Sequence, residues 1–412
     1  MKFAHMADCH IGGWKDFPMR ELSIRAFERA CRMVMEQGAD FLLIAGDLFN
    51  TALPAIDKLK SVVAVLKRLQ QAGIPVYIIP GSHDFSPSGK TMLDVLEEAE
   101  LLTNVMKGEV QEGKVRLRFT TDPKTGAKMT GILGKRGMLE KRYYEALDAE
   151  SLEREPGFKI FLFHTALSEL KPKELTLMQA YPVSFLPKGF DYYAGGHVHI
   201  VRHADIEGYR NVVYPGPLFP NSFAEVEKLQ GGGFSWYDDG KISYEHVRVV
   251  NVHSTTLDCG QKTPGAVQEM LMQLARKQAW NNTLVTIRLT GCLDGKVSDL
   301  DFREVFAELY RRGAYFVMKS ASLLTSREFS EVRVAEQSVE AAEERLMAEH
   351  AGQVQAWEDE IGMMRQLLHE LLLEKGEGEG KSDFEQRVVR AARQALGITA
   401  GAAGSAGDQA RQ

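Results

Sequence analysis

The stretch Val76-Tyr77-Ile78-Ile79-Pro80-Gly81-Ser82-His83-Asp84 joins a short apolar run to a polar segment that begins with glycine. Four other segments repeat this arrangement. Their apolar runs cover residues 3–7, 41–45, 160–163 and 192–194, and the polar residues that follow are Asp8, His10, Asp47, His164, His197 and His199. Short apolar runs bounded by Gly or Pro are typical of buried β-strands. The sequence therefore predicts five strands, each followed by a chemically active side chain.

The segments between the first three strands have helical periodicity. Apolar residues recur at spacings of three to five up to Gly38, and at three to four up to Gly73; they are Leu22, Phe27, Ala30 and Val34, then Leu59, Val62, Leu66 and Leu69. Alternating strands and helices predict an α/β fold with right-handed crossovers. Because the carboxyl ends of strands in such sheets share one edge, we expect the polar residues to converge there.

Composition places the chain among ordinary globular proteins. It has 412 residues, 44% hydrophobic and 26% charged, which suits two or three domains. No apolar run approaches twenty residues, so we expect neither membrane insertion nor secretion. The four cysteines, Cys9, Cys31, Cys259 and Cys292, are scattered without metal-site or disulfide spacing, which favours a reducing cytoplasm.

The charge is unevenly distributed. The net charge is −6, but residues 331–412 contain 16 acidic and nine basic residues, which leaves the preceding part at +1. This balance argues against a uniformly basic nucleic-acid-binding protein. Local basic pairs remain, each of which is equally compatible with a solvated surface: Arg116 and Arg118, Lys135 and Arg136, Lys141 and Arg142, Lys171 and Lys173.

Patterning divides the chain into four parts. Residues 1–250 form the catalytic unit. The pattern breaks at 255–264, and a small α/β domain within 251–325 is expected to contain helices at 267–279 and 301–311 and strands at 283–289 and 314–319. Residues 326–398 hold a linker and a helical hairpin, and 399–412 a disordered Gly/Ala/Ser tail.

The predicted hairpin has two helices. The first carries a narrow apolar seam with steps of three and four: Val354, Trp357, Ile361, Met364, Leu368 and Leu371. After a flexible break at 376–380, the second starts with a capping box at Ser382 to Glu385. The seam favours docking on a partner protein, with folding back on its own domain as the alternative.

The aspartates and histidines are typical of a dinuclear metal centre. Asp47 suits a bridging carboxylate. Asp8, His10 and His199 would complete one metal, and His164 and His197 the other. A ligand set of imidazoles and carboxylates without a thiolate favours manganese, iron or zinc, and manganese is the first choice. His83 would be the general acid that protonates the leaving oxygen, with Asp84 orienting its ring.

Together these motifs resemble those of calcineurin-like metallophosphoesterases: Asp8-Cys9-His10, Gly46-Asp47-Leu48-Phe49, Gly81-Ser82-His83-Asp84, His164 and Gly196-His197-Val198-His199. Within that superfamily, the opening residues 2–8 and the chain length resemble the SbcD and meiotic-recombination-eleven DNA double-strand-break repair nucleases. The small domain resembles their DNA-capping domain, and the terminal helices resemble the segment that binds the coiled-coil root of an SMC-like ATPase.

The resemblance implies a two-sheet α/β sandwich core. It also implies a homodimeric, manganese-dependent nuclease with two divalent metal ions per chain. This enzyme would have 3′-to-5′ exonuclease and single-strand endonuclease activity at DNA ends.

Three residues depart from the family pattern. Ser82 replaces an Asn that binds the second metal, so Ser82 would bind only through water. Asn50 replaces a histidine, and Pro217 a serine. Two other functions stay open: hydrolysis of a small phosphoester, and a DNA-end-binding scaffold whose catalysis was weakened by the Ser82 change.

Overall fold

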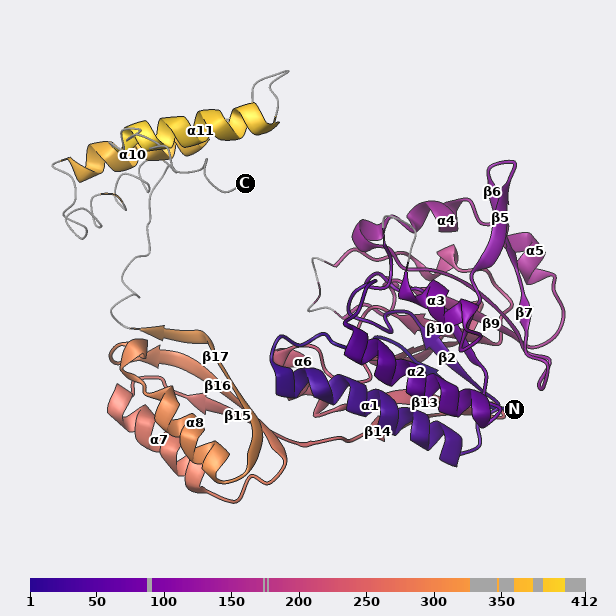
Figure 1. Ribbon diagram of the computed structural model, residues 1–412, viewed down its shortest axis with the longest axis horizontal. Helices are drawn as coiled ribbons and strands as arrows, with labels where there is room; N and C mark the ends of the chain where they lie inside the picture. The colour runs from indigo at the N-terminus through magenta and orange to yellow at the C-terminus, as the bar shows by residue number, and fades with distance from the viewer. Residues whose placement is uncertain are drawn as a thin grey trace, which may run out of the picture. The chain divides into compact units, whose positions relative to one another are not determined.

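The computed structural model describes residues 1–86, 91–172, 175, 178–326, 347, 359–372 and 381–396. Its contacts divide the chain into two compact units, Met1–Glu328 and Phe329–Gln412. The first unit contains both large sheets and a third, smaller sheet (Figure 1). None of the described helices combines the length and apolar character that a bilayer crossing requires.

The first large sheet contains three of the predicted strands. Its six strands, in spatial order, are β14 (Lys241–Val247), β13 (Gly232–Asp238), β1 (Lys2–Met6), β2 (Phe41–Ala45), β3 (Val76–Ile79) and β4 (Thr103–Asn104). Strands β1 to β4 are parallel, whereas β13 and β14 pair antiparallel at the other edge. Strands β1 to β3 consist mainly of buried apolar residues, as strands covered on both faces require.

The second large sheet contains the other two predicted strands. Its order is β11 (Val201–Ile206), β12 (Tyr209–Pro215), β10 (Tyr192–Gly196), β9 (Lys159–His164), β8 (Lys128–Ile132) and β7 (Thr120–Thr121). A buried cluster joins the two sheets face to face, and in it the rings of Phe3 and Tyr192 meet edge-on at 5.0 Å. This is the expected two-sheet α/β sandwich, and the five site-bearing strands come from both sheets.

Helices cover the outer face of the first sheet. They are α1 (Phe17–Glu36), α2 (Ile56–Gln71) and α3 (Met92–Glu98), and Figure 1 shows α1 and α2 side by side. Their apolar faces pack on β1 to β3. Helices α1 and α2 end two residues before Gly38 and Gly73, which adopt φ of 67° and 71°, confirming the predicted stops.

Short elements complete this part of the first unit. They are β5 (Lys107–Gln111), β6 (Lys114–Arg118), η1 (Arg136–Met138), α4 (Lys141–Glu145), α5 (Ala149–Glu153), η2 (Val183–Phe185) and α6 (Phe223–Leu229). Strands β5 and β6 form an antiparallel hairpin. Helices α4 and α6 lie in loops that approach the predicted site, as described below.

The third sheet belongs to the small α/β region. It contains parallel strands β15 (Asn251–Asp258), β16 (Thr283–Leu293) and β17 (Ala314–Ser326), with α7 (Pro264–Arg276), η3 (Val297–Asp299) and α8 (Phe302–Arg311). The predicted pattern break at 255–264 was misplaced, because β15 runs through Asp258. This edge strand is polar and only half-buried, so it lacks the apolar run that identified the others.

This region contacts the two-sheet core through apolar side chains, such as buried Leu284, and through polar ones. Arg288 of β16 forms a two-pronged ion pair with Glu227 of α6, and its guanidinium lies over the Phe223 ring. The hydroxyl of Tyr315 donates to the Pro18 carbonyl over 2.9 Å. The contacts tie β16 and β17 to α6 and α1.

The second unit contains α10 (Glu360–Leu372) and α11 (Lys381–Ala395), which contact each other as the hairpin prediction expects. Helix α11 begins one residue before Ser382, the predicted N-cap. Val354, Trp357, the break at 376–380 and the tail at 399–412 lie outside the described residues.

Candidate metal centre

The predicted ligands converge because two loops are joined by backbone hydrogen bonds. After β1 and β2 the chain continues as a paired loop, in which the Asp8 amide donates to the Gly46 carbonyl over 3.1 Å and the His10 amide to the Asp47 carbonyl over 2.9 Å. The carboxyl ends of β9 and β10 bring the remaining histidines to the same edge. Asp8, His10, Asp47 and His164 are each at most 3% exposed.

The backbone of this edge is strained. Five predicted ligands adopt positive φ, a region that non-glycine residues rarely occupy: Asp8 at 51°, His10 at 40°, Asp47 at 54°, His197 at 94° and His199 at 54°. Such conformations cost about 1–3 kcal/mol each and cluster at functional sites. The strain turns successive side chains into one space rather than to alternate faces.

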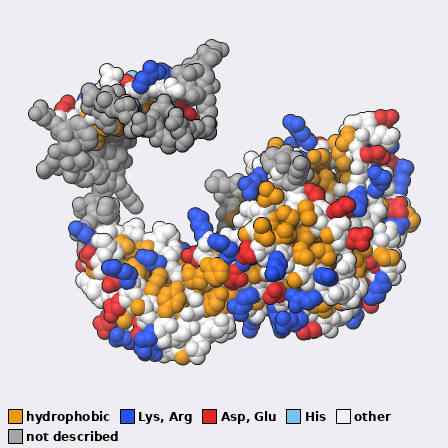
Figure 2. All heavy atoms as spheres, in the orientation of Figure 1, with side chains coloured by type: hydrophobic (Ala, Val, Ile, Leu, Met, Phe, Trp, Pro, Cys, Tyr) orange, Lys and Arg blue, Asp and Glu red, His pale blue; other side chains and the backbone are white. Residues whose placement is uncertain are grey.

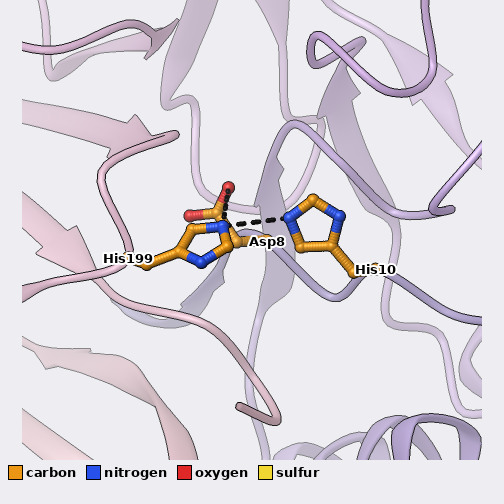
Figure 3. A group of neighbouring side chains, drawn as sticks. All are labelled: Asp8, His10 and His199. Carbon is orange, nitrogen blue, oxygen red and sulfur yellow. Dashed lines mark hydrogen bonds and ion pairs between the residues drawn. The ribbon is translucent and has the colours of Figure 1, made fainter. Parts of the chain in front are cut away.

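Asp8, His10 and His199 form the first cluster (Figure 3). Nε2 of His10 and Nε2 of His199 are 3.0 Å apart, and Nε2 of His199 lies 3.7 Å from Oδ1 of Asp8. Two ligands at right angles around a metal, each about 2.1 Å from it, would lie about 3.0 Å apart. The spacing therefore fits one cation.

Asp47 lies between two sets of histidines. Its Oδ2 is 3.6 Å from Nε2 of His10 and 3.2 Å from Nε2 of His164, and it groups with His164 and Asp8 on one side and with His10 and His83 on the other. Burial alone would raise the pKa of Asp47, but the neighbouring His164 and His10 outweigh burial and lower it. A carboxylate that stays ionised between two ligand sets suits a bridging position.

His197 occupies the same edge in a different way. Its backbone amide donates to both oxygens of Asp8 over 3.0 Å, and its ring centroid is 5.2 Å from that of His164. Burial, reinforced by the charge of His164, lowers its pKa to about 4. A neutral imidazole beside His164 is the form in which a metal is bound.

The donor set fits cations for a further reason. Nδ1 of His164 is 2.8 Å from the Ala45 carbonyl and Nδ1 of His199 is 3.1 Å from Oε1 of Glu225. When each Nδ1 carries the proton and donates, Nε2 presents a lone pair to the site. In this form both Nε2 atoms face the carboxylates, with Nε2 of His164 3.2 Å from Asp47 and Nε2 of His199 3.7 Å from Asp8, so a cation between them would find nitrogen and oxygen donors together.

His83 and Ser82 adjoin the Asp47 carboxylate. The His83 amide donates to Oδ1 over 2.7 Å, and the Ser82 hydroxyl donates to Oδ2 over 3.5 Å. Nδ1 of the His83 ring is 2.8 Å from the Asn50 carbonyl, so Nε2 is the nitrogen on the other side of this contact. The His83 side chain is partly exposed. Asn50, one of the three departures, therefore orients His83 through its backbone.

The prediction that Asp84 orients the His83 ring is wrong. The Asp84 carboxylate instead accepts three backbone N–H groups, from Leu48 at 3.2 Å, Phe49 at 3.0 Å and Gly81 at 3.1 Å. Burial and the charge of Asp47 raise its pKa to about 7. Asp84 thus joins the β2 and β3 loops, while the hydrogen bond of the His83 ring goes to the Asn50 carbonyl.

Sequence reasoning also missed Glu225. It lies in the first turn of α6, where Ser222 caps the helix and Oε2 of Glu225 accepts the Asn221 amide over 2.8 Å. Burial opposes charge on His199, but Asp8 and Glu225 outweigh it and raise the pKa of His199. The Ser222-Phe223-Ala224-Glu225 pattern is itself a capping-box signal, so a helix start near the site was detectable.

The chain is similar to known proteins of one family. Residues 1–201 match the family described as calcineurin-like phosphoesterase. The chain is 29% identical over 238 residues to a DNA double-strand break repair protein Mre11 of Archaeoglobus fulgidus, covering 56% of this chain and 52% of the relative. It is 30% identical over 266 residues to the Mre11 protein of Methanopyrus kandleri, covering 60% and 57%.

A third relative has a less specific name. The uncharacterized metallophosphoesterase YhaO of Bacillus subtilis is 24% identical over 269 residues, covering 61% of each chain. The chain spans little more than half the length of the two archaeal relatives.

Proposed function

Because residues 1–201 match the calcineurin-like phosphoesterase family, we propose that this protein is a metal-dependent DNA nuclease that processes ends in double-strand-break repair. The proposed activities are 3′-to-5′ exonuclease on duplex ends and endonuclease on single strands. The names of the archaeal relatives support DNA as the substrate. The observation that carries the proposal is Asp47, whose carboxylate lies between two histidine sets.

Two divalent cations per chain, with manganese as our choice, are the proposed cofactors. Asp8, His10 and His199 would hold one, His164 and His197 the other, and Asp47 both; Ser82 would approach the second through water. When bound, such cations supply an activated water and neutralise charge on phosphate oxygens. The imidazole and carboxylate donors without thiolate support this choice.

His83 is the proposed proton donor to the leaving oxygen. Its Nδ1 lies against the Asn50 carbonyl at 2.8 Å, which fixes the ring and directs Nε2 away from that contact. The ring lies 4.7 Å, centroid to centroid, from that of His10, so it adjoins the proposed metals. A partly exposed imidazole can exchange protons with solvent between turnovers.

The remaining parts have proposed binding roles. Residues 251–325 would cap DNA, and α10 with α11 would bind the coiled coil of an SMC-like ATPase. The chain would work as a homodimer in the cytoplasm. Leu371 of the predicted seam and its neighbour Leu372 are each more than half exposed, which supports a partner on α10.

The test is cleavage of end-labelled linear duplex and single-stranded DNA by the full chain with and without manganese. Wild type, His83→Ala and Ser82→Asn are compared, and metal content is measured on the same samples. We expect wild-type cleavage that requires manganese, with activity lost and metals retained in His83→Ala. Turnover of small aryl phosphoesters without cleavage of any DNA would overturn the nuclease assignment.

A second readout concerns the mode of DNA binding. Because phosphate contacts dominate nucleic-acid affinity, the affinity for DNA should fall steeply between 50 and 200 mM salt, on the order of 10³-fold for six contacts. An affinity that does not change with salt would contradict this.

A further inference from the structure

Lys135 is held between two aromatic rings beside the candidate metal centre. Its Nζ lies 4.8 Å from the centroid of Phe85 and 4.6 Å from that of Tyr143, and it donates to the Tyr143 hydroxyl over 2.9 Å. All three side chains are partly exposed. The cation–π contact with Phe85 contributes about 0.5–1 kcal/mol, and the hydrogen bond to the Tyr143 hydroxyl restricts the ammonium further.

The backbone places this cluster against the metal centre. Gly134 precedes Lys135, and its amide donates to the Pro80 carbonyl over 3.0 Å. A Cβ added at Gly134 would lie 2.4 Å from Cδ2 of His164, so the chain passes directly over this predicted ligand. Phe85 follows His83 by two residues. The loop that carries Lys135 therefore passes beside His164, and its ammonium contacts Phe85 in the segment of His83.

A buried carboxylate fixes the loop that carries Lys135. Oε2 of Glu140 accepts the Lys135 amide over 3.1 Å, and its Oε1 accepts the Thr165 hydroxyl over 3.2 Å. Glu140 is 2% exposed, and Thr165 directly follows His164. Glu140 therefore holds the backbone of Lys135 at a set position relative to His164.

The ammonium keeps hydrogen-bonding capacity for a ligand. A lysine has three N–H donors, and one is used by Tyr143. Across the part of the chain that the structure describes, no carboxylate lies within ion-pair distance of Nζ of Lys135, whereas the neighbouring Lys141 pairs with Glu145 at 3.0 Å. A positioned, unneutralised ammonium with free donors is suited to an anion.

We propose that Lys135, held by Phe85 and Tyr143, binds a phosphodiester of the nucleic-acid strand next to the phosphate that is cleaved. The proposal rests on the nuclease function and names a substrate subsite for it. A backbone phosphate matches a point charge with free donors, and a partly exposed aromatic edge tolerates any adjacent sugar or base. The subsite would favour polynucleotides over small phosphoesters without selecting a base sequence.

The test measures kcat and KM of the full manganese-loaded chain on a labelled single strand from 50 to 200 mM salt. Lys135→Met keeps the apolar stem and removes the charge, Lys135→Arg keeps the charge, and Tyr143→Phe removes the hydroxyl alone. Lys141→Met is the matched control, because Lys141 is a nearby exposed lysine already paired with Glu145. Bis(4-nitrophenyl) phosphate serves as a diester without neighbouring phosphates, and metal content is measured throughout.

We expect Lys135→Met to raise KM for the strand roughly three- to tenfold and to lower the slope of log KM against log salt by about 0.7, the loss of one single-strand phosphate contact. The KM of Lys135→Arg should be close to that of wild type. The KM of Tyr143→Phe should lie between those of wild type and Lys135→Met, and the KM of Lys141→Met should equal the wild-type value.

Three results would overturn the subsite: a KM for Lys135→Met within twofold of wild type, an equal loss on the small diester, or loss of metal. The last two would make Lys135 a structural residue of the metal centre. Failure of wild type to cleave any DNA is a separate result, which rejects the nuclease function itself.

Discussion

Oε1 of Glu225 lies 3.1 Å from Nδ1 of His199, on the side of the imidazole opposite to Asp8 and His10. A carboxylate in this place fixes the ring orientation and the tautomer of a metal-binding histidine. Helix α6 positions this carboxylate, because Ser222 caps its first turn.

Replacing Glu225 with Ala should weaken manganese binding about 10- to 100-fold, the usual effect of removing such a partner. Glu225→Gln keeps one acceptor oxygen and should lose less. Isothermal titration calorimetry measures both affinities. Glu227→Gln is the control on the same helix, because Glu227 pairs with Arg288 and not with a predicted ligand. Wild-type affinity in Glu225→Ala would mean that His199 needs no orienting group.

Replacing His83 with Ala should reduce kcat for DNA cleavage by about 10²- to 10⁴-fold, the typical contribution of a positioned general acid. The metals should stay bound, since the Asp47 contact is made by the backbone amide of residue 83, which alanine retains. Rapid-quench cleavage assays and metal analysis of the same samples measure the two effects. A variant that loses both activity and metal would assign His83 to metal binding.

Replacing Asp84 with Asn should destabilise the fold by about 1–3 kcal/mol. The carboxylate accepts three backbone N–H groups, whereas an amide has one acceptor oxygen and turns donors toward donors. Urea unfolding with the metal chelated measures the free energy. Asp205→Asn is the control, because exposed Asp205 accepts one backbone amide, that of Asn211, among the described residues. Equal effects of the two substitutions would show that the three bonds contribute little.

His5 should make stability depend on pH. It is fully buried beside Tyr192, and burial lowers its pKa to about 3, although a hydrogen bond with the Gly195 backbone opposes this. The folded state then keeps His5 neutral while the unfolded state protonates it below about pH 6.5, so its stabilising contribution is lost as pH falls.

As the pH falls from 7.0 to 5.5, His5 alone should lower the free energy of unfolding by about 1 kcal/mol. Urea unfolding of wild type and His5→Gln with the metal chelated isolates it, since the other titrating groups are shared. The wild type should lose more stability than the variant over this interval. Parallel pH profiles would show that His5 is protonated equally in both states.

Local sequence patterns were enough to predict several strands and helices of this protein. Short apolar runs with aspartate or histidine after them predicted five strands, β1, β2, β3, β9 and β10, because burial on both faces leaves a continuous apolar signature. Helical spacing and glycine stops identified α1 and α2 for the same kind of local reason. The half-buried edge strand β15 escaped because pairing, and not an apolar face, holds it in the sheet.

Only the tertiary structure decided which groups the site residues touch. Asp84 accepts amides that lie 35 and 36 residues away, and His199 meets Glu225 across 26 residues. Lys135 contacts the rings of Phe85, in the loop after β3, and Tyr143, in α4. Hydrogen bonds and cation–π contacts depend on distances and angles within a few ångströms, and these are set when distant segments pack. The sequence thus predicted which side chains could bind a metal. Packing determined that Glu225 contacts the His199 ring and that Asp84 joins two loops.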